Sequence, residues 1–147
     1  MQWQRENFII STDKSKLDIA YIHRFLSNDS YWAAGIPFVI VEKSIKNSLC
    51  FGIYDGEKQI GFARIITDEA TFGYLADVFV DTAYRGKGLS KWLMQVILNL
   101  PFVALLRGFM LATKDAHMLY EQFGFRSLSN PERFMRLHRS DVYQTIS

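Results

Sequence analysis

The chain has 147 residues, of which 49% are hydrophobic and 22% are charged, and this composition is typical of a globular domain. Lys and Arg number 17 against 15 Asp and Glu, and the resulting net charge of +2 does not favour nucleic acid or an anionic membrane surface as a partner. Because Cys50 is the only cysteine, an intrachain disulfide and a multi-cysteine zinc site are excluded.

Hydrophobic periodicity and turn signals predict an ordered series of short strands and helices. In chain order we expect a strand at 8–11, a helix at 17–25, a helix from Pro37 onward, strands at 50–54, 59–66 and 71–81, a helix at 89–100, a strand at 109–113, a helix at 115–123 and a strand at 134–138. This order predicts a mixed α/β fold with an antiparallel front half. No repeat, low-complexity tract or linker divides the chain, so we expect one domain over residues 1–147.

Local signals set the expected ends of these elements. Asp13 or Ser15 can cap the first helix, and Asp55-Gly56 is a strong hairpin turn. Pro101 and Gly124 each end a helix, because proline cannot continue one and glycine favours its C-terminal stop.

A turn rich in glycine and positive charge joins the strand at 71–81 to the helix that follows it. Its sequence is Arg85-Gly86-Lys87-Gly88-Leu89-Ser90. A helix N-terminus presents unpaired N–H groups and a partial positive charge, and glycine lets the backbone approach a ligand closely, so this turn is a candidate phosphate site. The structural alternative is a glycine-containing loop with solvated cations. The turn lacks the Gly-Lys-Ser/Thr of a P-loop and the third glycine of a dinucleotide fingerprint.

Two segments, in this order, resemble motifs of the GNAT superfamily of N-acetyltransferases. The turn at 85–90 is similar to its Arg/Gln-x-x-Gly-x-Gly/Ala coenzyme A motif. The segment at 116–125, Ala-His-Met-Leu-Tyr-Glu-Gln-Phe-Gly-Phe, is similar to its Ala-x-x-Leu-Tyr-x-x-x-Gly-Phe helix and turn. The resemblance runs from Cys50 to the end of the chain and more loosely over the N-terminal helices. It implies the GNAT acyl-CoA N-acyltransferase fold, a central mixed and mostly antiparallel sheet flanked by helices, with acetyl-CoA as co-substrate.

The resemblance also implies which residues bind acetyl-CoA. Backbone groups of one strand pair with the pantetheine arm and polarise the acetyl carbonyl, while N–H groups of the glycine turn hold the pyrophosphate. Ser90 stands where the family has a last glycine or alanine, and Thr113 stands where it commonly has an asparagine. The expected cofactor-binding residues are Val78, Phe79, Val80, Arg85, Gly86, Lys87, Gly88, Leu89, Ser90, Thr113 and Tyr120.

Tyr120 aligns with the tyrosine of the second motif. The resemblance implies that its hydroxyl points at the coenzyme sulfur and acts as the general acid. A tyrosine pKa of about 10 keeps that hydroxyl protonated at neutral pH, as a proton donor must be. The alternative is a core aromatic on an amphipathic helix. His117, three residues earlier, has no assigned role.

Asp77 interrupts an otherwise apolar strand, where an unpaired charge is costly. We expect it to be the base that removes a proton from the acceptor, directly or through water, as acidic residues on this strand often do in the superfamily. Strict alternation places it on one face with Leu75 and Phe79. The alternative is a structural carboxylate paired with an arginine or with backbone N–H groups. Asp68 and Glu69 are weaker candidates, because acids in turns are usually solvated.

Tyr31 and Trp32 lie between the first two predicted helices, in the segment that lines the acceptor side in this superfamily. With the flexible Gly35 they are candidates for a substrate-binding lid or wall that can stack on a cation. The alternative is that both aromatics fill the core between the helices. The sequence holds no cluster with metal-ligand spacing, so we expect no metal.

The resemblance implies an enzyme that transfers the acetyl group of acetyl-CoA to a primary amine by direct attack in a ternary complex. The amine belongs to a small molecule or to a peptide or protein. A non-catalytic acyl-CoA-binding or sensing module is the alternative; the changes at Ser90 and Thr113 are compatible with it, whereas Tyr120 argues against it. A transferase of the toxin type, acting on aminoacyl-tRNA, is a third interpretation, against which the near-neutral charge argues.

We expect a cytoplasmic protein with an amine acceptor and no nucleic acid or membrane among its partners. The N-terminal segment lacks the apolar core of a signal peptide. The most apolar stretch, 96–106, contains Asn99 and Pro101 and falls far short of the ~20 residues that span a bilayer. We expect a monomer or a homodimer, since an edge strand near the C-terminus would allow pairing.

Overall fold

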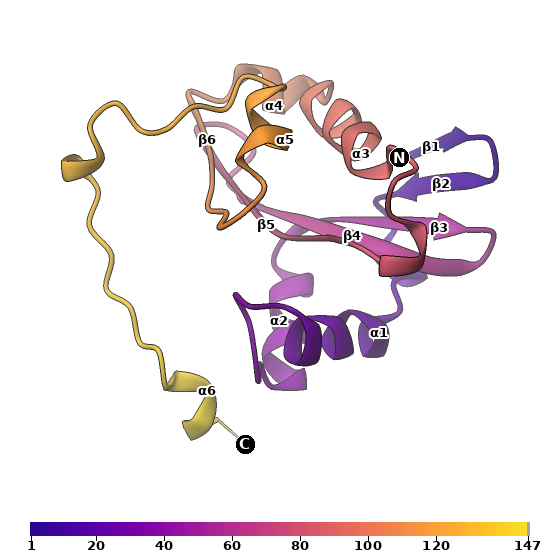
Figure 1. The fold of residues 1–147 in the computed structure, drawn as a ribbon, viewed down its shortest axis with the longest axis horizontal. Coiled ribbons are helices and arrows are strands. Elements are labelled where there is room, and N and C mark those ends of the chain that lie inside the picture. Colours follow the sequence, from indigo (N-terminus) through magenta and orange to yellow (C-terminus); the bar gives the residue numbers. More distant parts are fainter. Residues whose placement is uncertain (147) are drawn as a thin grey trace.

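The computed structural model describes residues 1–146, and a sheet of six strands forms its centre (Figure 1). The strands are β1 (Gln2–Arg5), β2 (Phe8–Ser11), β3 (Leu49–Asp55), β4 (Lys58–Thr67), β5 (Phe72–Val80) and β6 (Gly108–Leu111), and they lie in this order across the sheet. Neighbours from β1 to β5 run antiparallel, whereas β5 and β6 run parallel. The mixed and mostly antiparallel sheet predicted from the sequence is therefore confirmed.

Helices cover both faces of the sheet (Figure 1). They are α1 (Ile19–Arg24), which continues as a π-helical turn over Phe25–Asp29, α2 (Phe38–Lys46), α3 (Leu89–Leu98), α4 (Pro101–Leu105), α5 (His117–Glu121) and α6 (Val142–Thr145). α1 and α2 lie on one face, and α3 and α4 lie on the other. No helix within residues 1–146 combines the length and the apolar character needed to cross a membrane.

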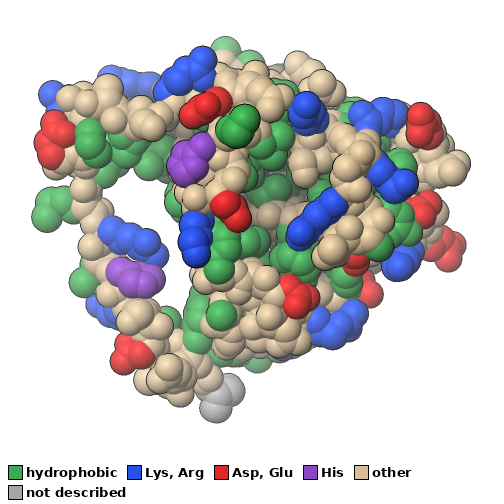
Figure 2. Space-filling view, viewed as in Figure 1, with side chains coloured by type: hydrophobic (Ala, Val, Ile, Leu, Met, Phe, Trp, Pro, Cys, Tyr) green, Lys and Arg blue, Asp and Glu red, His purple; other side chains and the backbone are tan. Residues whose placement is uncertain are grey.

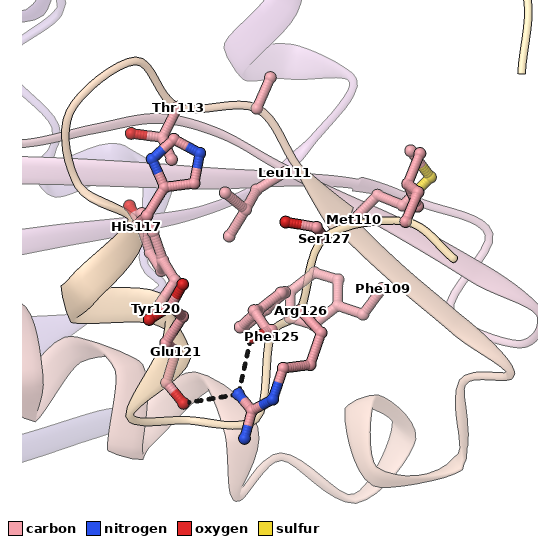
Figure 3. Close-up of a pocket in the computed structure, with 12 residues that line it drawn as sticks. Phe109, Met110, Leu111, Thr113, His117, Tyr120, Glu121, Phe125, Arg126 and Ser127 are labelled. Carbon is pink, nitrogen blue, oxygen red and sulfur yellow. Dashed lines mark hydrogen bonds between the residues drawn. The ribbon is translucent and has the colours of Figure 1, made fainter. Parts of the chain in front are cut away.

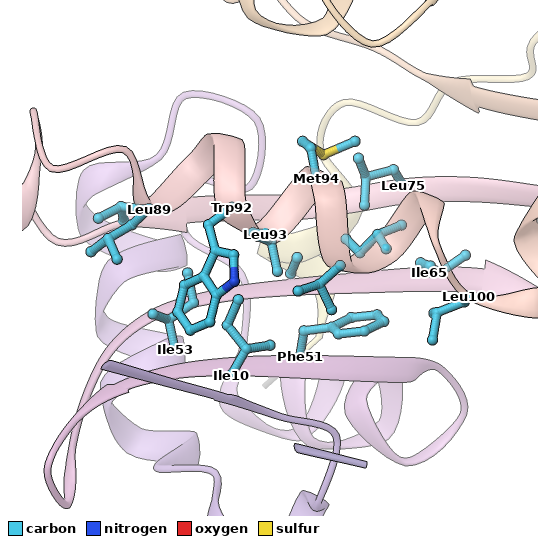
Figure 4. Close-up of a cluster of buried hydrophobic side chains, with 14 of the residues drawn as sticks. Ile10, Phe51, Ile53, Ile65, Leu75, Leu89, Trp92, Leu93, Met94 and Leu100 are labelled. Carbon is cyan, nitrogen blue, oxygen red and sulfur yellow. The ribbon is translucent and has the colours of Figure 1, made fainter. Parts of the chain in front are cut away.

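Two hydrophobic clusters fill the spaces between the sheet and its helices. The larger cluster lies under α3, where Phe51 and Leu93 are fully buried (Figure 4). The smaller cluster lies under α1 and α2, where Val41 and Phe62 are fully buried. Burial is worth about 25 cal/mol per Å² of apolar surface, so these clusters are the main source of stability. Cys50 belongs to the smaller cluster, and burial raises the pKa of its thiol to about 11, so it is not a reactive thiol.

Two of the predicted end signals act differently in the structure. Asp18, rather than Asp13 or Ser15, caps α1, because its carboxylate accepts a hydrogen bond from the N–H of Tyr21 at 3.0 Å. Asp13 instead caps a single 3-10 turn by accepting from the N–H and the hydroxyl of Ser15. Pro101 follows α3 as predicted, but it also begins α4, since a first helical position needs no N–H donor.

The strand predicted at 134–138 is wrong, because this segment has no partner strand within the described part of the chain. Residues 131–140 are all exposed, and the tail extends away from the body of the molecule (Figures 1 and 2). Outside α6, the backbone hydrogen bonds of the described residues from Arg126 on join residues three apart. The tail then returns to the side of α1 and α2, where Tyr143 packs against the smaller cluster.

Replacing Leu93 by Ala tests the cluster under α3. The variant leaves a cavity in a fully buried position, so the free energy of unfolding should fall by about 2–5 kcal/mol, measured in urea. Leu105→Ala is the matched control, because Leu105 on α4 is 81% exposed, and its effect should stay within about 0.5 kcal/mol. Equal losses in the two variants would contradict this assignment of the core.

Candidate active site

β5 continues past the end of β6, and part of its backbone is left without a partner on that side. The parallel pairing stops where Leu75 lies opposite Leu111. From Ala76 to Val80, β5 pairs only with β4. Apart from the Val80 carbonyl, which accepts from Arg85, the backbone groups of this segment that face the side of β6 are therefore open to an extended ligand. They lie in the stretch that contains three of the expected cofactor-binding residues, Val78, Phe79 and Val80.

A β-bulge in the same segment changes the direction of its side chains. Ala63 of β4 lies opposite two residues of β5, Asp77 and Val78, and Asp77 has a left-handed φ of 55°. Leu75 therefore belongs to the larger cluster, whereas Phe79 belongs to the smaller one. The strict alternation expected from the sequence is wrong for this reason, because the extra residue reverses the faces after it.

Asp77 is held by two side chains from other elements. Arg64 on β4 donates through Nε to Oδ2 of Asp77 at 2.6 Å and forms a salt bridge with it. Trp32 donates through Nε1 to Oδ1 at 2.8 Å. Arg64 also donates to the hydroxyl of Ser48 at 3.0 Å, which fixes the guanidinium. Each carboxylate oxygen thus has a donor, and the arginine pairing named as the structural alternative is present.

Tyr31 and Trp32 lie at the surface and join two loops across the end of the sheet. Their side chains are 52% and 42% exposed, so they do not fill the core between the helices. The hydroxyl of Tyr31 accepts a hydrogen bond from the N–H of Lys114 at 2.8 Å, in the loop between β6 and α5. The two rings meet edge to face, with their centroids 5.1 Å apart. The hydrogen bond from Trp32 to Asp77 connects this aromatic pair directly to the carboxylate.

Tyr120 presents a hydroxyl without a partner from a buried ring. The residue is 7% exposed, and its ring packs edge-on against Phe125 with 5.9 Å between centroids. Burial raises the pKa of the hydroxyl to about 12, so it remains a donor at neutral pH. Within residues 1–146, no hydrogen bond to this hydroxyl contributes to that shift.

A pocket of about 270 Å³ opens beside Tyr120, between β6, α5 and the segment at 125–128 (Figure 3). Thr113 and His117 line the same pocket. The hydroxyl oxygen of Thr113 accepts from the N–H of Ala116 at 3.0 Å, which caps the turn before α5. The sequence motif at 116–125 thus places its tyrosine and its neighbours along one opening.

The glycine turn forms the N-terminus of α3. Gly86 and Gly88 have left-handed φ values of 82° and 76°, which would strain any side chain placed there. The N–H groups from Gly86 to Lys91, six in a row, have no hydrogen-bond acceptor among the described residues. A helix ordinarily leaves about four such groups free, so this turn is an enlarged anion site. The side chain of Arg85 folds back and donates to the carbonyl of Val80 at 3.2 Å.

Arg5 of β1 holds the carbonyl side of this turn. Its Nη2 donates to the carbonyl oxygens of Lys87 and Gly88 at 3.4 Å each, and its guanidinium lies 4.8 Å from the centroid of the Trp92 ring. Sequence reasoning missed both this contact and β1 itself, because β1 is a short polar edge strand whose pairing partner alone reveals it.

A second pocket, of about 220 Å³, lies on the side of α1 near the end of β5. It is lined by Tyr21, Arg24, Phe25, Asp29, Asp81 and Thr82. Tyr21 donates to Asp81 at 3.2 Å, and burial together with this carboxylate raises the pKa of the tyrosine. Sequence reasoning missed this pocket, since its residues are brought together only by the packing of α1 on the sheet.

The two acidic residues in the turn between β4 and β5, Asp68 and Glu69, form hydrogen bonds within that turn. Asp68 accepts hydrogen bonds from the hydroxyl and N–H of Thr71 and from the N–H of Ala70, and these hold its pKa below the ordinary value. Glu69 donates its N–H to the hydroxyl of Thr67 in the same turn. Over residues 1–146, no group of three His, Cys, Asp or Glu side chains is placed to hold a metal ion.

Comparison with known proteins identifies a domain family that contains this site. Residues 46–127, which include β5, the glycine turn and Tyr120, match the acetyltransferase (GNAT) domain. The chain is similar to a candidate acetyltransferase of the GNAT family from Xanthomonas campestris, whose crystal structure is 46% identical, covers 92% of this chain and 96% of that one, and superposes with a TM-score of 0.89.

Two more distant relatives agree with this. A candidate acetyltransferase from Gibberella zeae is 29% identical over 145 residues, which cover 84% of this chain and 82% of that protein. The structure of a candidate acetyltransferase from Deinococcus radiodurans shares the fold, with a TM-score of 0.72 at 18% identity over 96% of this chain and 95% of that one. The chain therefore belongs to the GNAT family of acetyltransferases.

Proposed function

We propose that this chain, acting as one catalytic domain, transfers the acetyl group of acetyl-CoA to a primary amine. The amine attacks directly while both substrates are bound. One observation carries this proposal: the row of N–H groups at the start of α3, which have no acceptor within residues 1–146, follows a strand with an unpaired edge. The hydroxyl of Tyr120, which has no hydrogen-bond partner among the same residues, adds a proton donor. Anion binding, backbone pairing and proton donation are the functions that a coenzyme A thioester requires of a protein.

The glycine turn fits a pyrophosphate. The N–H groups from Gly86 to Lys91 supply donors, the helix N-terminus adds a partial positive charge, and Lys87 adds a full one. Gly86 has open space where a side chain would lie, so a ligand can approach its backbone. Leu89 is buried and anchors the helix, while Ser90 adds a hydroxyl in its first turn.

The free side of β5 supports the binding of the pantetheine arm. Between Ala76 and Phe79 the strand keeps N–H and C=O groups that no strand within residues 1–146 uses on the side of β6, whereas the carbonyl of Val80 accepts from Arg85. A fixed N–H in this stretch can also stabilise the negative charge that forms on the thioester oxygen during transfer. Thr113 follows the end of β6 and lines the pocket next to Tyr120.

Asp77 is our proposed proton acceptor, acting through water. An alkyl amine with a pKa of about 10.4 is almost fully protonated at pH 7, a deficit of about 4.6 kcal/mol for the reactive form. Arg64 and Trp32 each donate to the Asp77 carboxylate, and the lone pairs left after these two hydrogen bonds remain able to accept from a water molecule. Once this proton has left, the neutral amine uses its lone pair to attack the carbonyl carbon of the thioester and form the new carbon–nitrogen bond.

Tyr120 is our proposed general acid. When the carbon–sulfur bond breaks, the sulfur leaves as a thiolate, and the hydroxyl of Tyr120 can give it a proton. The raised pKa, about 12, keeps that proton in place until the thiolate forms.

Tyr31 and Trp32 support an acceptor site next to Asp77. Their exposed rings can stack on a cationic group of the acceptor. The second pocket, on the side of α1, adds two carboxylates, Asp29 and Asp81, against one guanidinium, that of Arg24. This arrangement favours an acceptor that carries positive charge besides its reacting nitrogen.

Gly88→Glu should weaken the binding of acetyl-CoA. The side chain strains a left-handed position and places a negative charge in the anion site, so calorimetric titration should show affinity at least 10-fold weaker. Gly56→Glu is the matched control, because Gly56 is also left-handed, with a φ of 61°, but lies in the hairpin between β3 and β4. Equal affinity in the two variants would remove the turn from the proposed site.

Tyr120→Phe should lower kcat by about 100-fold while the affinity for acetyl-CoA stays close to that of the parent. Thiol release with a panel of amines measures the rate. In the parent, kcat should not fall between pH 7 and pH 10, because a pKa of about 12 keeps Tyr120 protonated there. Tyr54→Phe is the control, since it is also a buried tyrosine whose hydroxyl lacks a partner within residues 1–146. Binding without thiol release in the parent would support the sensing module instead.

Asp77→Asn should lower kcat by about 100-fold at pH 7, and the deficit should shrink as the pH rises, because more of the amine is then already deprotonated. The side-chain oxygen of Asn can still accept a hydrogen bond from Trp32, so the position of the Trp32 ring should not change. Asp55→Asn, which alters a carboxylate that accepts from Tyr84 outside the site, is the control. A loss of unfolding free energy with an unchanged pH profile of kcat would assign Asp77 to structure alone.

A further inference from the structure

The guanidinium of Arg5 connects the glycine turn to the hydrophobic core. Arg5 is the last residue of β1, and its Nη2 donates to the carbonyl oxygens of Lys87 and Gly88 at 3.4 Å each. The same guanidinium lies 4.8 Å from the centroid of the Trp92 ring, which belongs to the larger cluster and is 8% exposed. Stacking on a buried ring limits the movement of the guanidinium, so Arg5 holds the turn from a fixed position.

These two hydrogen bonds determine the direction of two N–H groups in the middle of the turn. A trans peptide unit is planar, so its C=O and N–H groups point in opposite directions. The carbonyl of Lys87 shares a peptide unit with the N–H of Gly88, and the carbonyl of Gly88 shares one with the N–H of Leu89. Because both carbonyls are directed toward Arg5, both N–H groups are directed away from it, and neither has an acceptor within residues 1–146.

The turn needs such a contact because glycine allows its backbone several conformations. Gly86 and Gly88 both have left-handed φ values, which glycine can leave at little cost. At Gly86 no atom lies within 4 Å of the place of a side chain, whereas at Gly88 the nearest atom is Nη2 of Arg5, at 3.7 Å. Among the described residues, Arg5 is also the only hydrogen-bond donor to the carbonyl of Lys87.

A second contact joins the same hairpin to the chain just before the glycine turn. Phe8 lies opposite Arg5 in the pairing of β1 with β2. Its ring meets that of Tyr84 edge to face, with 6.2 Å between the centroids. Tyr84 is the last residue of the 3-10 turn that precedes the glycine turn. The hairpin therefore contacts this part of the chain at two places, through Phe8 before the glycine turn and through Arg5 within it.

We propose that Arg5 is a positioning residue for acetyl-CoA, which directs the N–H groups of Gly88 and Leu89 toward the pyrophosphate before the ligand arrives. Ordering the turn in advance lowers the conformational cost of binding. The positive charge of Arg5 also offsets the partial negative charge of the two carbonyl oxygens that lie close to the bound anion. This inference rests on the proposed function, because it takes the turn as the pyrophosphate site, and it assigns part of that site to a residue outside both sequence motifs.

Calorimetric titration of acetyl-CoA into Arg5→Gln tests this role. Glutamine is shorter and uncharged, so it cannot hold both carbonyls, and the affinity should be about 10-fold weaker than that of the parent. Arg107→Gln is the matched control, because it removes the same charge from an exposed residue between α4 and β6. It should bind acetyl-CoA as tightly as the parent does. Equal affinity in Arg5→Gln and the parent would overturn the inference.

Titration of S-acetylpantetheine at millimolar concentration separates positioning from general support of the fold. This ligand has the thioester and the arm of acetyl-CoA but no pyrophosphate, so Arg5→Gln and the parent should bind it with affinities within about twofold of each other. An equal loss of affinity for both ligands would overturn the inference, because Arg5 would then stabilise the whole site and not the turn.

The same titrations distinguish failure of this inference from failure of the proposed function. A parent that does not bind acetyl-CoA would overturn both. A parent that binds acetyl-CoA and releases its thiol with an amine, together with an Arg5→Gln variant of equal affinity, would overturn the role of Arg5 alone.

Discussion

The proposed site depends on the bulge in β5 and on the ion pair that secures it. Asp77 has a left-handed φ of 55°, and such a conformation costs a residue with a side chain about 1–3 kcal/mol. Arg64 and Trp32 offset that cost, since each donates to a different carboxylate oxygen, at 2.6 Å and 2.8 Å. Arg64 belongs to β4, directly beside the bulge, so the pair fixes the path of β5 where it continues past β6.

Two parts of the site follow from that path. Past Leu75, β5 keeps unpaired backbone groups on the side of β6, and its last residues lead directly into the glycine turn. Arg5 then donates hydrogen bonds to two carbonyl oxygens of that turn. The N–H groups of the turn have no acceptor within residues 1–146. One continuous stretch of chain therefore supplies both the strand edge and the anion site, and their relative position is set by local geometry rather than by docking of separate parts.

Sequence reasoning succeeded where neighbouring residues decide the structure. The hairpin at Asp55-Gly56, the glycine turn and the helix around Tyr120 each depend on local preferences. It failed where distant pairs decide: the Arg64–Asp77 bridge joins two strands, and Arg5 reaches a turn 82 residues away. The bulge belongs to this second group, because the reversal of faces in β5 arises from its register with β4 and not from its own alternation.

The segment at 134–138 shows a third case, in which the pattern of a strand is present but one chain offers it no partner. An unpaired edge such as that of β6 is a hazard for any sheet, and exposed apolar residues are another. The free edge of β6 lies beside the pocket of Tyr120, whose hydroxyl keeps its proton at neutral pH because burial raises its pKa to about 12. A strand pattern in the sequence expresses only a local preference, and whether it pairs is decided by distant contacts, as it is for the bridge between Arg64 and Asp77.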